Sequence, residues 1–449
     1  MIEPKYIIFI ILFITLVPAA SVVVNRFPKL SWITLFAAIF FTSNMVDINF
    51  VSREWYRGTS RGFEVGMVDM ATLVLMAYAI ANRRKYEFNP LPRGSLVFIA
   101  YFLCSAISIV NCEEKLFGYF ELFKMVRVYV FFWTMNNIII SHKVINRILY
   151  FTSFVSIYVF FFVLRDKYYY GMYQNSGPFP HQNSLVMYMM ILANIHFSCW
   201  MSSKTAKEII YWCFVVSCEL FCIVSTLSRA GLALTAVSML IVLFFHLSWK
   251  ISFKKLAVVT MLCLIGMAGM VKSLDSIITR FLTAPEASAN TRVILAQAAV
   301  KMADDKQLGI GLNNFSLKMS SKYPYSSHIE VKVDEDGQEE AGGIVETVYL
   351  LIASECGWHT LGVYFFMLIS FYMRNLVNLF RTKDPFLKSI CIGIFAGLTG
   401  IYVESSLEWV LKQTNNFYEL MLIFALINAI IRIRQKGGDL VNPQVVIEK

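Results

Sequence analysis

Two arginines of the sequence, Arg229 and Arg292, are candidates for binding a phosphate group. Arg229 follows Ser228 in a break of a few residues between two apolar runs. An arginine beside a membrane span costs about 2.5–3.5 kcal/mol unless it reaches water or a partner. The guanidinium fork pairs two phosphate oxygens at once, so Arg229 is either a diphosphate clamp or an interfacial arginine reaching water. Arg292 opens an expected helix with Asn290 as its N-cap, where a solvated arginine is the ordinary interpretation.

Two further side chains are candidates for a general base. Glu346 stands at the start of an apolar run, where a carboxylate is expected to have a raised pKa and can accept a proton. The alternative role for Glu346 is to cap the N-terminus of the following helix. His328, in the segment YPYSSHIE, is the other candidate base, and its alternative is an exposed loop histidine.

Polar residues at the ends of other apolar runs suit sugar binding. His181 and Asn183 in PFPHQN are either sugar contacts or part of a turn in which Asn183 is the N-cap. Glu404 and Trp409 combine a carboxylate with an aromatic ring, which suits an acceptor sugar, although interfacial anchoring explains them equally well. The acidic segment 334–340 does not match the calcium-loop pattern, and no cysteine–histidine cluster has metal-ligand spacing. The sequence therefore predicts no metal and no cofactor.

The composition requires a membrane. Of the 449 residues, 57% are hydrophobic and only 16% are charged, whereas soluble domains carry about 25% charged residues. Apolar runs in lipid must be helices that satisfy their own backbone hydrogen bonds. We predict an all-α polytopic bundle of about 12–13 transmembrane helices, with the opening segment as an uncleaved first helix. The candidate spans are 6–24, 31–50, 66–81, 95–111, 119–139, 146–164, 184–201, 207–227, 229–248, 255–272, 345–373, 386–405 and 415–433.

The basic residues predict the orientation. Lysine and arginine concentrate in alternate loops and in the C-terminal tail, and among the other loops only Arg53, Arg57 and Arg61 form a cluster. Because positive residues stay on the cytoplasmic side, the net charge of +10 is a topology signal and not a nucleic-acid surface. Lys124 and Arg127 interrupt the span 119–139 and make it the weakest one.

One loop on the predicted outer side is much longer than the rest. We divide the chain into an N-terminal transmembrane bundle (1–271), this large extracytoplasmic loop (272–344), and C-terminal helices with a short cytoplasmic tail (345–449). A loop of this length in a compact protein is usually functional. No glycine-rich nucleotide loop or zinc motif occurs in the sequence.

Four segments, in order, resemble the O-antigen ligase and polymerase superfamily. They are GPFPHQNSLVMYMM (177–190), STLSRAGLALTAVSMLIV (225–242), NTRVILAQAAVKMADDKQLGIGLNNF (290–315) and VETVYLLIASECGW (345–358). The third contains an arginine, a short helix and then Gly-x-Gly-x-x-Asn-Phe. RGTSRGFEVGMVD (57–69) is a further point of similarity in the N-terminal third.

The resemblance implies a metal-independent glycosyltransferase of GT-C-like architecture in the bacterial cytoplasmic (inner) membrane, with its active site facing the periplasm or exterior. Its donor would be a glycan on undecaprenyl diphosphate. A ligase passes the glycan to a lipid A-core sugar, whereas a polymerase passes it to the next lipid-linked repeat unit of a surface polysaccharide or exopolysaccharide. A co-polymerase that regulates chain length is a candidate partner, besides the acceptor glycan and membrane lipid.

The resemblance also assigns roles to residues. It makes Arg229 and Arg292 diphosphate-binding residues and adds Arg280 as a third. Ligases of the family have a His-Asn-x-Tyr-Leu pattern before the helix that re-enters the membrane, and here the aligned residues are Glu346-Thr347-Val348-Tyr349-Leu350. This departure favours a polymerase-like member with Glu346 as the base.

A secondary transporter or a flippase for lipid-linked glycans is the competing hypothesis. Transporters show inverted repeats with paired broken helices near the bilayer midplane. The two halves of the sequence contain no matching pair of Gly/Pro-interrupted spans. A receptor would not account for the four segments.

Overall fold

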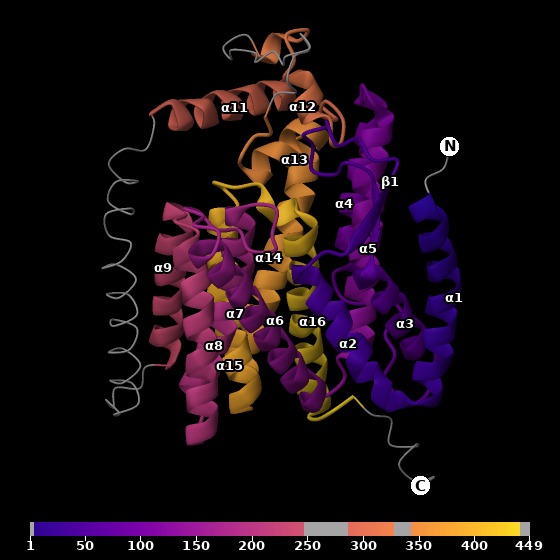
Figure 1. The fold of residues 1–449 in the computed structure, drawn as a ribbon, viewed down its shortest axis with the longest axis vertical. Helices are drawn as coiled ribbons and strands as arrows, with labels where there is room; N and C mark the ends of the chain where they lie inside the picture. Colours follow the sequence, from indigo (N-terminus) through magenta and orange to yellow (C-terminus); the bar gives the residue numbers. More distant parts are fainter. Residues whose placement is uncertain (1–3, 247–285, 327–342, 441–449) are drawn as a thin grey trace. The chain divides into compact units, whose positions relative to one another are not determined.

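The computed structural model describes residues 4–246, 286–326 and 343–440 (Figure 1). Within these ranges, eight helices are long and apolar enough to cross a membrane, and three shorter apolar helices accompany them. The only sheet described has two short strands. The prediction of an all-α polytopic membrane protein is therefore confirmed. The predicted span 255–272 lies outside the described residues.

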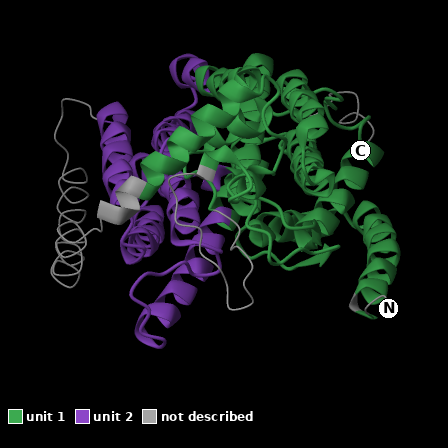
Figure 2. Ribbon diagram, turned by 90° about the horizontal axis from the view of Figure 1, so that it is seen from above, with its two compact units in different colours: residues 1–151, 291–374, 412–449 green, residues 152–290, 375–411 purple. Residues whose placement is uncertain are grey.

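The chain divides into two compact units (Figure 2). Unit 1 comprises residues 1–151, 291–374 and 412–449, and unit 2 comprises residues 152–290 and 375–411. This division follows packing, whereas the division at 271 and 344 follows the membrane topology, which stays a prediction.

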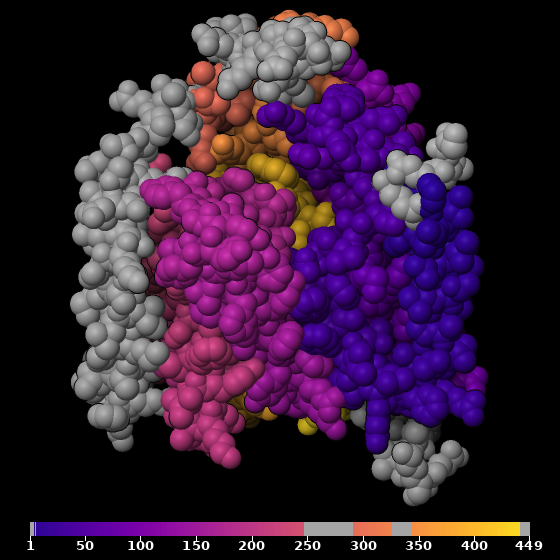
Figure 3. All heavy atoms as spheres, in the orientation of Figure 1, coloured from indigo at the N-terminus to yellow at the C-terminus, as the bar shows by residue number. Residues whose placement is uncertain are grey.

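In unit 1, helix α16 packs against α5 and α2, and α3 packs against α1, α2 and α5. The span of α16 is entirely buried, whereas only 6% of the span of α1 is buried, as expected for a helix that faces lipid (Figure 3). The longer helices of unit 1 are α1 (Pro4–Arg26), α2 (Ser31–Ser43), α3 (Met67–Ala81), α4 (Ser95–Ser108), α5 (Lys115–Ile138) and α16 (Thr414–Lys436). Its short 3-10 turns are η1 (Pro28–Leu30), η2 (Ile109–Asn111) and η3 (Pro324–Ser326).

A β-hairpin interrupts the second predicted span. Strand β1 (Asp47–Phe50) pairs antiparallel with β2 (Phe63–Gly66), with Asp47 opposite Gly66. The single span 31–50 is thus wrong, because α2 ends at Ser43 and the following residues pair with β2 instead of continuing the helix.

Three helices of unit 1 come from the segment around the large loop. They are α11 (Glu286–Asp305, in unit 1 from Thr291), α12 (Phe315–Lys318) and α13 (Val348–Cys356). Because α11 begins at Glu286, Asn290 lies inside the helix, and the prediction that it is the N-cap is wrong. The single span 345–373 is also wrong, because Gly357 with φ of +87° separates α13 from α14 (Trp358–Arg381).

Unit 2 is a bundle around α7, which packs against α8, α9 and α15. Glycines allow the close approach: a Cβ on Gly393 or Gly397 would overlap α7, and one on Gly231 of α9 would overlap Val186. The helices are α6 (His142–Tyr168, in unit 2 from Thr152), α7 (Gln182–Ser202), α8 (Ala206–Ser225), α9 (Arg229–His246) and α15 (Pro385–Glu404). The turn η4 (Val410–Lys412) follows α15.

Candidate functional site

Two of the predicted site residues contact each other in unit 1. Arg292 on α11 forms an ion pair with Glu346, which lies just before α13, through Nε and Oε2. Their side chains are 44% and 35% exposed, so a ligand can reach both. Burial raises the pKa of the Glu346 carboxyl above its ordinary value, while the adjacent Arg292 lowers it. The contact therefore joins a candidate phosphate-binding residue to a candidate base.

The Gly-x-Gly segment fixes the end of α11 to α13. The backbone N–H of Ile310 donates to the carbonyl of Ser354 over 2.9 Å, and that of Gly311 donates to the carbonyl of Glu355 over 3.0 Å. Gly309 has φ of +73°, and a Cβ there would overlap the backbone of Glu355. Only glycine allows this approach without strain. The two glycines thus hold α11 against the helix that follows Glu346.

Asn313 ties the same segment to the β-hairpin and α5. Its side-chain amide donates to the carbonyls of Ser60 and Phe117, both over 2.9 Å, and the backbone N–H of Thr59 donates to its Oδ1 over 2.8 Å. Asn313 has φ of +55°, a conformation that asparagine tolerates better than most residues. The stretch 57–69 and the outer-loop pattern, which are far apart in the sequence, therefore form one assembly.

Under this assembly lies a network of four buried charges that the sequence analysis missed. Lys124 contacts Glu121 at 2.7 Å, and Lys412 lies 3.5 Å from Glu121 and 3.4 Å from Glu355. Each of the four side chains is at most 4% exposed. Ser60 Oγ donates to Glu121 over 2.6 Å. The available signal was the spacing of Glu121 and Lys124, which places opposite charges on one face of α5.

A second buried ion pair lies further along the same helix. Arg127 on α5 donates from Nε to Asp69 Oδ2 on α3 over 3.0 Å, and its Nη2 lies 2.8 Å from the same oxygen in an ion pair. Tyr418 on α16 donates to the other oxygen over 2.6 Å. From the sequence alone, Arg127 is predicted only to interrupt the span 119–139. In the structure, Arg127 joins three helices.

We expect Lys412→Met to destabilise unit 1 by about 3–5 kcal/mol, because it leaves Glu121 and Glu355 buried without this cation. The control is Lys436→Met, which removes a surface ion pair with Glu87 at 3.5 Å and is expected to cost at most about 1 kcal/mol. Unfolding of the purified protein in detergent measures both. Equal stability of the two variants would contradict the structural role of the network.

Unit 2 holds the other described site residues, near one end of α7. Arg229 is exposed at the first position of α9, and Glu404 is fully buried at the last position of α15. Because Gly231 approaches Val186 and Gly400 approaches Met190, both helix ends lie against the first turns of α7.

Among the described residues, neither carboxylate oxygen of Glu404 has a hydrogen-bond partner. Trp409 lies five residues further and is half-buried. A fully buried carboxylate without a partner is costly. This makes Glu404 a reasonable candidate for contact with a substrate.

The start of α7 differs from the prediction. His181 is the N-cap, with its ring Nδ1 accepting from the backbone N–H of Asn183 over 3.2 Å. Asn183 is buried inside the first turn, so the prediction that it is the N-cap is wrong. His181 itself is exposed. A capping role accounts for His181, and sugar contact by either residue stays a prediction.

His328 and Arg280 lie outside the described residues, so their relation to the other site residues stays a prediction. Within the described ranges, no His, Cys, Asp or Glu side chains gather in a group able to hold a metal ion. The absence of a metal from the reaction likewise stays a prediction.

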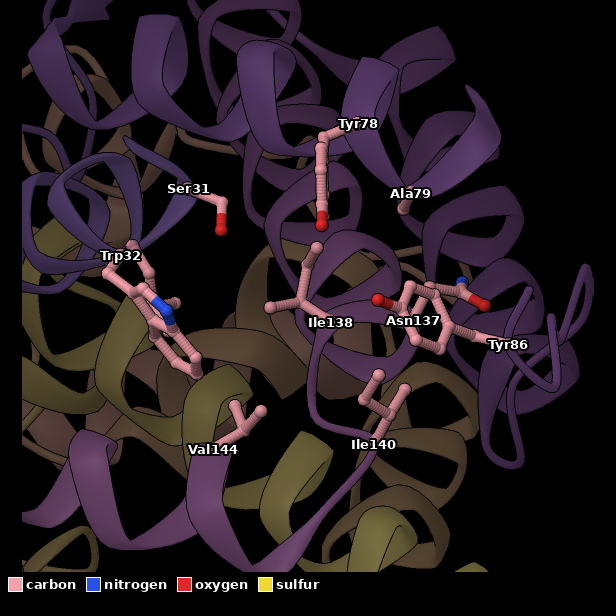
Figure 4. A pocket seen from close by; sticks show the side chains of 10 residues that line it. Ser31, Trp32, Tyr78, Ala79, Tyr86, Asn137, Ile138, Ile140 and Val144 are labelled. Carbon is pink, nitrogen blue, oxygen red and sulfur yellow. The ribbon is translucent and has the colours of Figure 1, made fainter. Parts of the chain in front are cut away.

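A small cavity of about 80 Å³ lies elsewhere in unit 1 (Figure 4). Trp32, Tyr78 and Tyr86 line it together with Asn137 and apolar side chains. None of the predicted site residues lines this cavity.

A family model described as O-antigen ligase matches residues 213–367. This match confirms the resemblance to the O-antigen ligase and polymerase superfamily. The O-antigen ligase region contains Arg229, Arg292 and Glu346, together with α9, α11 and α13. No curated protein matches the chain. With its apolar helices, the chain is a multi-pass membrane protein, and residues 213–367 are similar to the O-antigen ligase family.

Proposed function

We propose that the protein transfers a glycan from an undecaprenyl-diphosphate-linked donor to an acceptor sugar, and that it polymerises repeat units of a surface polysaccharide or exopolysaccharide. The observation that carries the proposal is the contact of Arg292 with Glu346 inside the O-antigen ligase region. In the proposal, Arg292 is the cation for the leaving group and Glu346 is the base for the acceptor, and their contact supports this pairing.

In the proposed reaction, an acceptor hydroxyl attacks the anomeric carbon of the donor sugar. The new bond joins the acceptor oxygen to that carbon, and the bond from the carbon to the diphosphate oxygen breaks. Glu346 takes the proton of the hydroxyl, and arginines stabilise the charge on the leaving diphosphate. Without a metal, such cations must supply the electrostatic stabilisation.

The ion pair suggests how donor binding prepares the base. A diphosphate that binds Arg292 competes with Glu346 for the guanidinium. Because Arg292 lowers the pKa of Glu346, the loss of this contact raises that pKa. The carboxylate becomes a stronger base when the donor is in place.

The remaining candidate residues have proposed roles in the same reaction. Arg229 and Arg280 bind the diphosphate with Arg292, and His328 is the alternative base. His181, Asn183, Glu404 and Trp409 contact the acceptor sugar. The unpartnered oxygens of Glu404 support its assignment.

The glutamate at the position of the ligase histidine favours a polymerase over a ligase. A polymerase would use a second lipid-linked repeat unit as the acceptor, with a co-polymerase as a candidate partner for chain length. A ligase would use a lipid A-core sugar. If the protein is a polymerase, the purified protein should form a ladder of products from lipid-linked repeat units alone. If it is a ligase, it should form no product until the separate lipid A-core acceptor is added.

We expect the loop that contains α11 to face the periplasm or exterior, because of the alternation of positive loops. In a cysteine-free background, Lys306→Cys should react with an impermeant maleimide before the cytoplasmic membrane is lysed. Arg84→Cys, in a loop predicted to be cytoplasmic, should react only after lysis. The opposite order of labelling would overturn the orientation.

A further inference from the structure

One face of α11 carries a groove that the proposed reaction does not use. A hollow of about 640 Å³ lies along Val293, Gln297, Lys301 and Asp304. These residues recur every three or four positions, so they share one side of the helix. On the other side, Leu295, Ala298, Ala299, Met302 and Ala303 are buried. The groove is therefore the solvent-facing side of an amphipathic helix.

A second hollow continues the first. It measures about 570 Å³ and lies between the end of α11, with Asp304 and Gln307, and the start of α14, with Trp358 and His359. Asp304 lines both hollows, so they adjoin at this residue, and we refer to the two together as the groove. From Val293, the residue after Arg292, the groove follows α11 for roughly 16 Å to Asp304, at 1.5 Å per residue.

The side chains of the groove match the chemistry of a sugar chain. Trp358 is 43% exposed, and its indole N–H donates to Asp304 over 2.8 Å, which fixes the orientation of the ring. Val293 and Val300 leave apolar surface exposed. An aromatic face and apolar patches suit the C–H faces of sugars, whereas the carboxylate of Asp304 and the amides of Gln297 and Gln307 suit their hydroxyls.

We propose that this groove binds the glycan of the lipid-linked donor, with Trp358 as the stacking platform for a sugar distant from the diphosphate. The inference rests on the proposed function, because Arg292 directly precedes Val293, where the groove begins, and the donor glycan is bonded to the diphosphate that Arg292 would hold. From that point, the groove leads the sugars toward Trp358.

The first test measures binding without transfer. The probe is the glycan released from its lipid by mild acid, which carries no diphosphate, added to the full-length protein in detergent and followed by saturation-transfer NMR and calorimetry. We expect Trp358→Ala to weaken binding by about 3–10-fold and Trp358→Phe to preserve it, since aromatic stacking contributes about 0.5–1.5 kcal/mol. The matched control is Trp55→Ala, which removes a tryptophan that is 60% exposed on the hairpin loop.

The second test uses transfer kinetics. Trp358→Ala and Gln307→Ala should raise KM for a donor carrying the full glycan and leave KM unchanged for a donor carrying a single sugar. Equal binding by Trp358→Ala and Trp55→Ala overturns the groove, as does a change confined to the acceptor KM. Trp358→Phe and Gln307→Ala keep the test decisive if Trp358→Ala does not fold.

The two proposals fail separately. Glycan binding that depends on Trp358, in a protein whose transfer activity does not depend on Arg292, would retain the groove and reject the diphosphate clamp. If transfer depends on Arg292 and substitution of Trp358 has no effect, the diphosphate clamp is retained and the groove is rejected.

Discussion

Arg292→Ala is expected to lower glycan transfer by about 10³–10⁵-fold, the size of effect seen for arginines that neutralise a departing phosphate. The side chain is half-exposed on α11 and already pairs with a carboxylate, so its guanidinium is directed to where an anion can bind. Arg292→Lys should restore activity only in part, because an ammonium offers a point charge without the bidentate fork. The measurement is the initial rate of product formation from a lipid-linked donor by purified protein.

The matched control is Lys306→Ala, which removes an exposed cation just after the C-terminal end of α11. It should transfer at the wild-type rate. Arg229→Ala, at the start of α9, is expected to behave like Arg292→Ala while keeping normal membrane expression. Full activity in both Arg292→Ala and Arg229→Ala would contradict the proposal that these arginines bind the diphosphate.

Glu346→Gln should slow transfer by about 10²–10⁴-fold, the usual contribution of a general base. Glutamine preserves the shape and loses the basic oxygen. In the wild type, activity should rise with pH through the pKa of Glu346, which burial raises above its ordinary value. This rise should be absent from the residual activity of Glu346→Gln, and it should move to higher pH in Arg292→Ala, where the lowering effect of the cation is gone.

His328→Ala tested beside Glu346→Gln identifies the base. If Glu346→Gln transfers normally and His328→Ala is inactive, the base is His328. If both retain activity, orientation and the arginines must supply the acceleration. Glu113→Gln, an exposed loop acid that pairs with Lys322 at 3.0 Å, is the control for loss of a carboxylate.

The helices could be predicted from the sequence because apolar runs of about 20 residues have few alternatives in lipid. The places where a predicted span is interrupted were harder to predict. Asp47–Phe50 closely follows the apolar run of the predicted span 31–50, and its pairing with Phe63–Gly66 makes it a strand. Gly357 breaks a continuous apolar run because its backbone, with positive φ, packs against the carbonyl of Gln307.

Ion pairs between residues far apart in the sequence cannot be predicted from a local sequence pattern. Arg292 and Glu346 were both predicted from their motifs, and the structure adds that they touch. Glu121, Lys124, Glu355 and Lys412 come from three distant segments, and each alone looks like a defect in an apolar region. Burial of a charge is interpretable only when its partner is known.

The order in which the chain is made gives the buried network a consequence for biogenesis. Helix α5 leaves the ribosome long before Glu355 and Lys412 are synthesised. During that interval, Lys124 can neutralise Glu121 one turn away, and Arg127 already has Asp69. Among the described residues, the cation that pairs with Glu355 is Lys412, which lies just before α16. A nascent chain that stops short of Lys412 would therefore carry an uncompensated carboxylate, a feature by which quality-control proteases in the membrane can distinguish unfinished chains from complete ones.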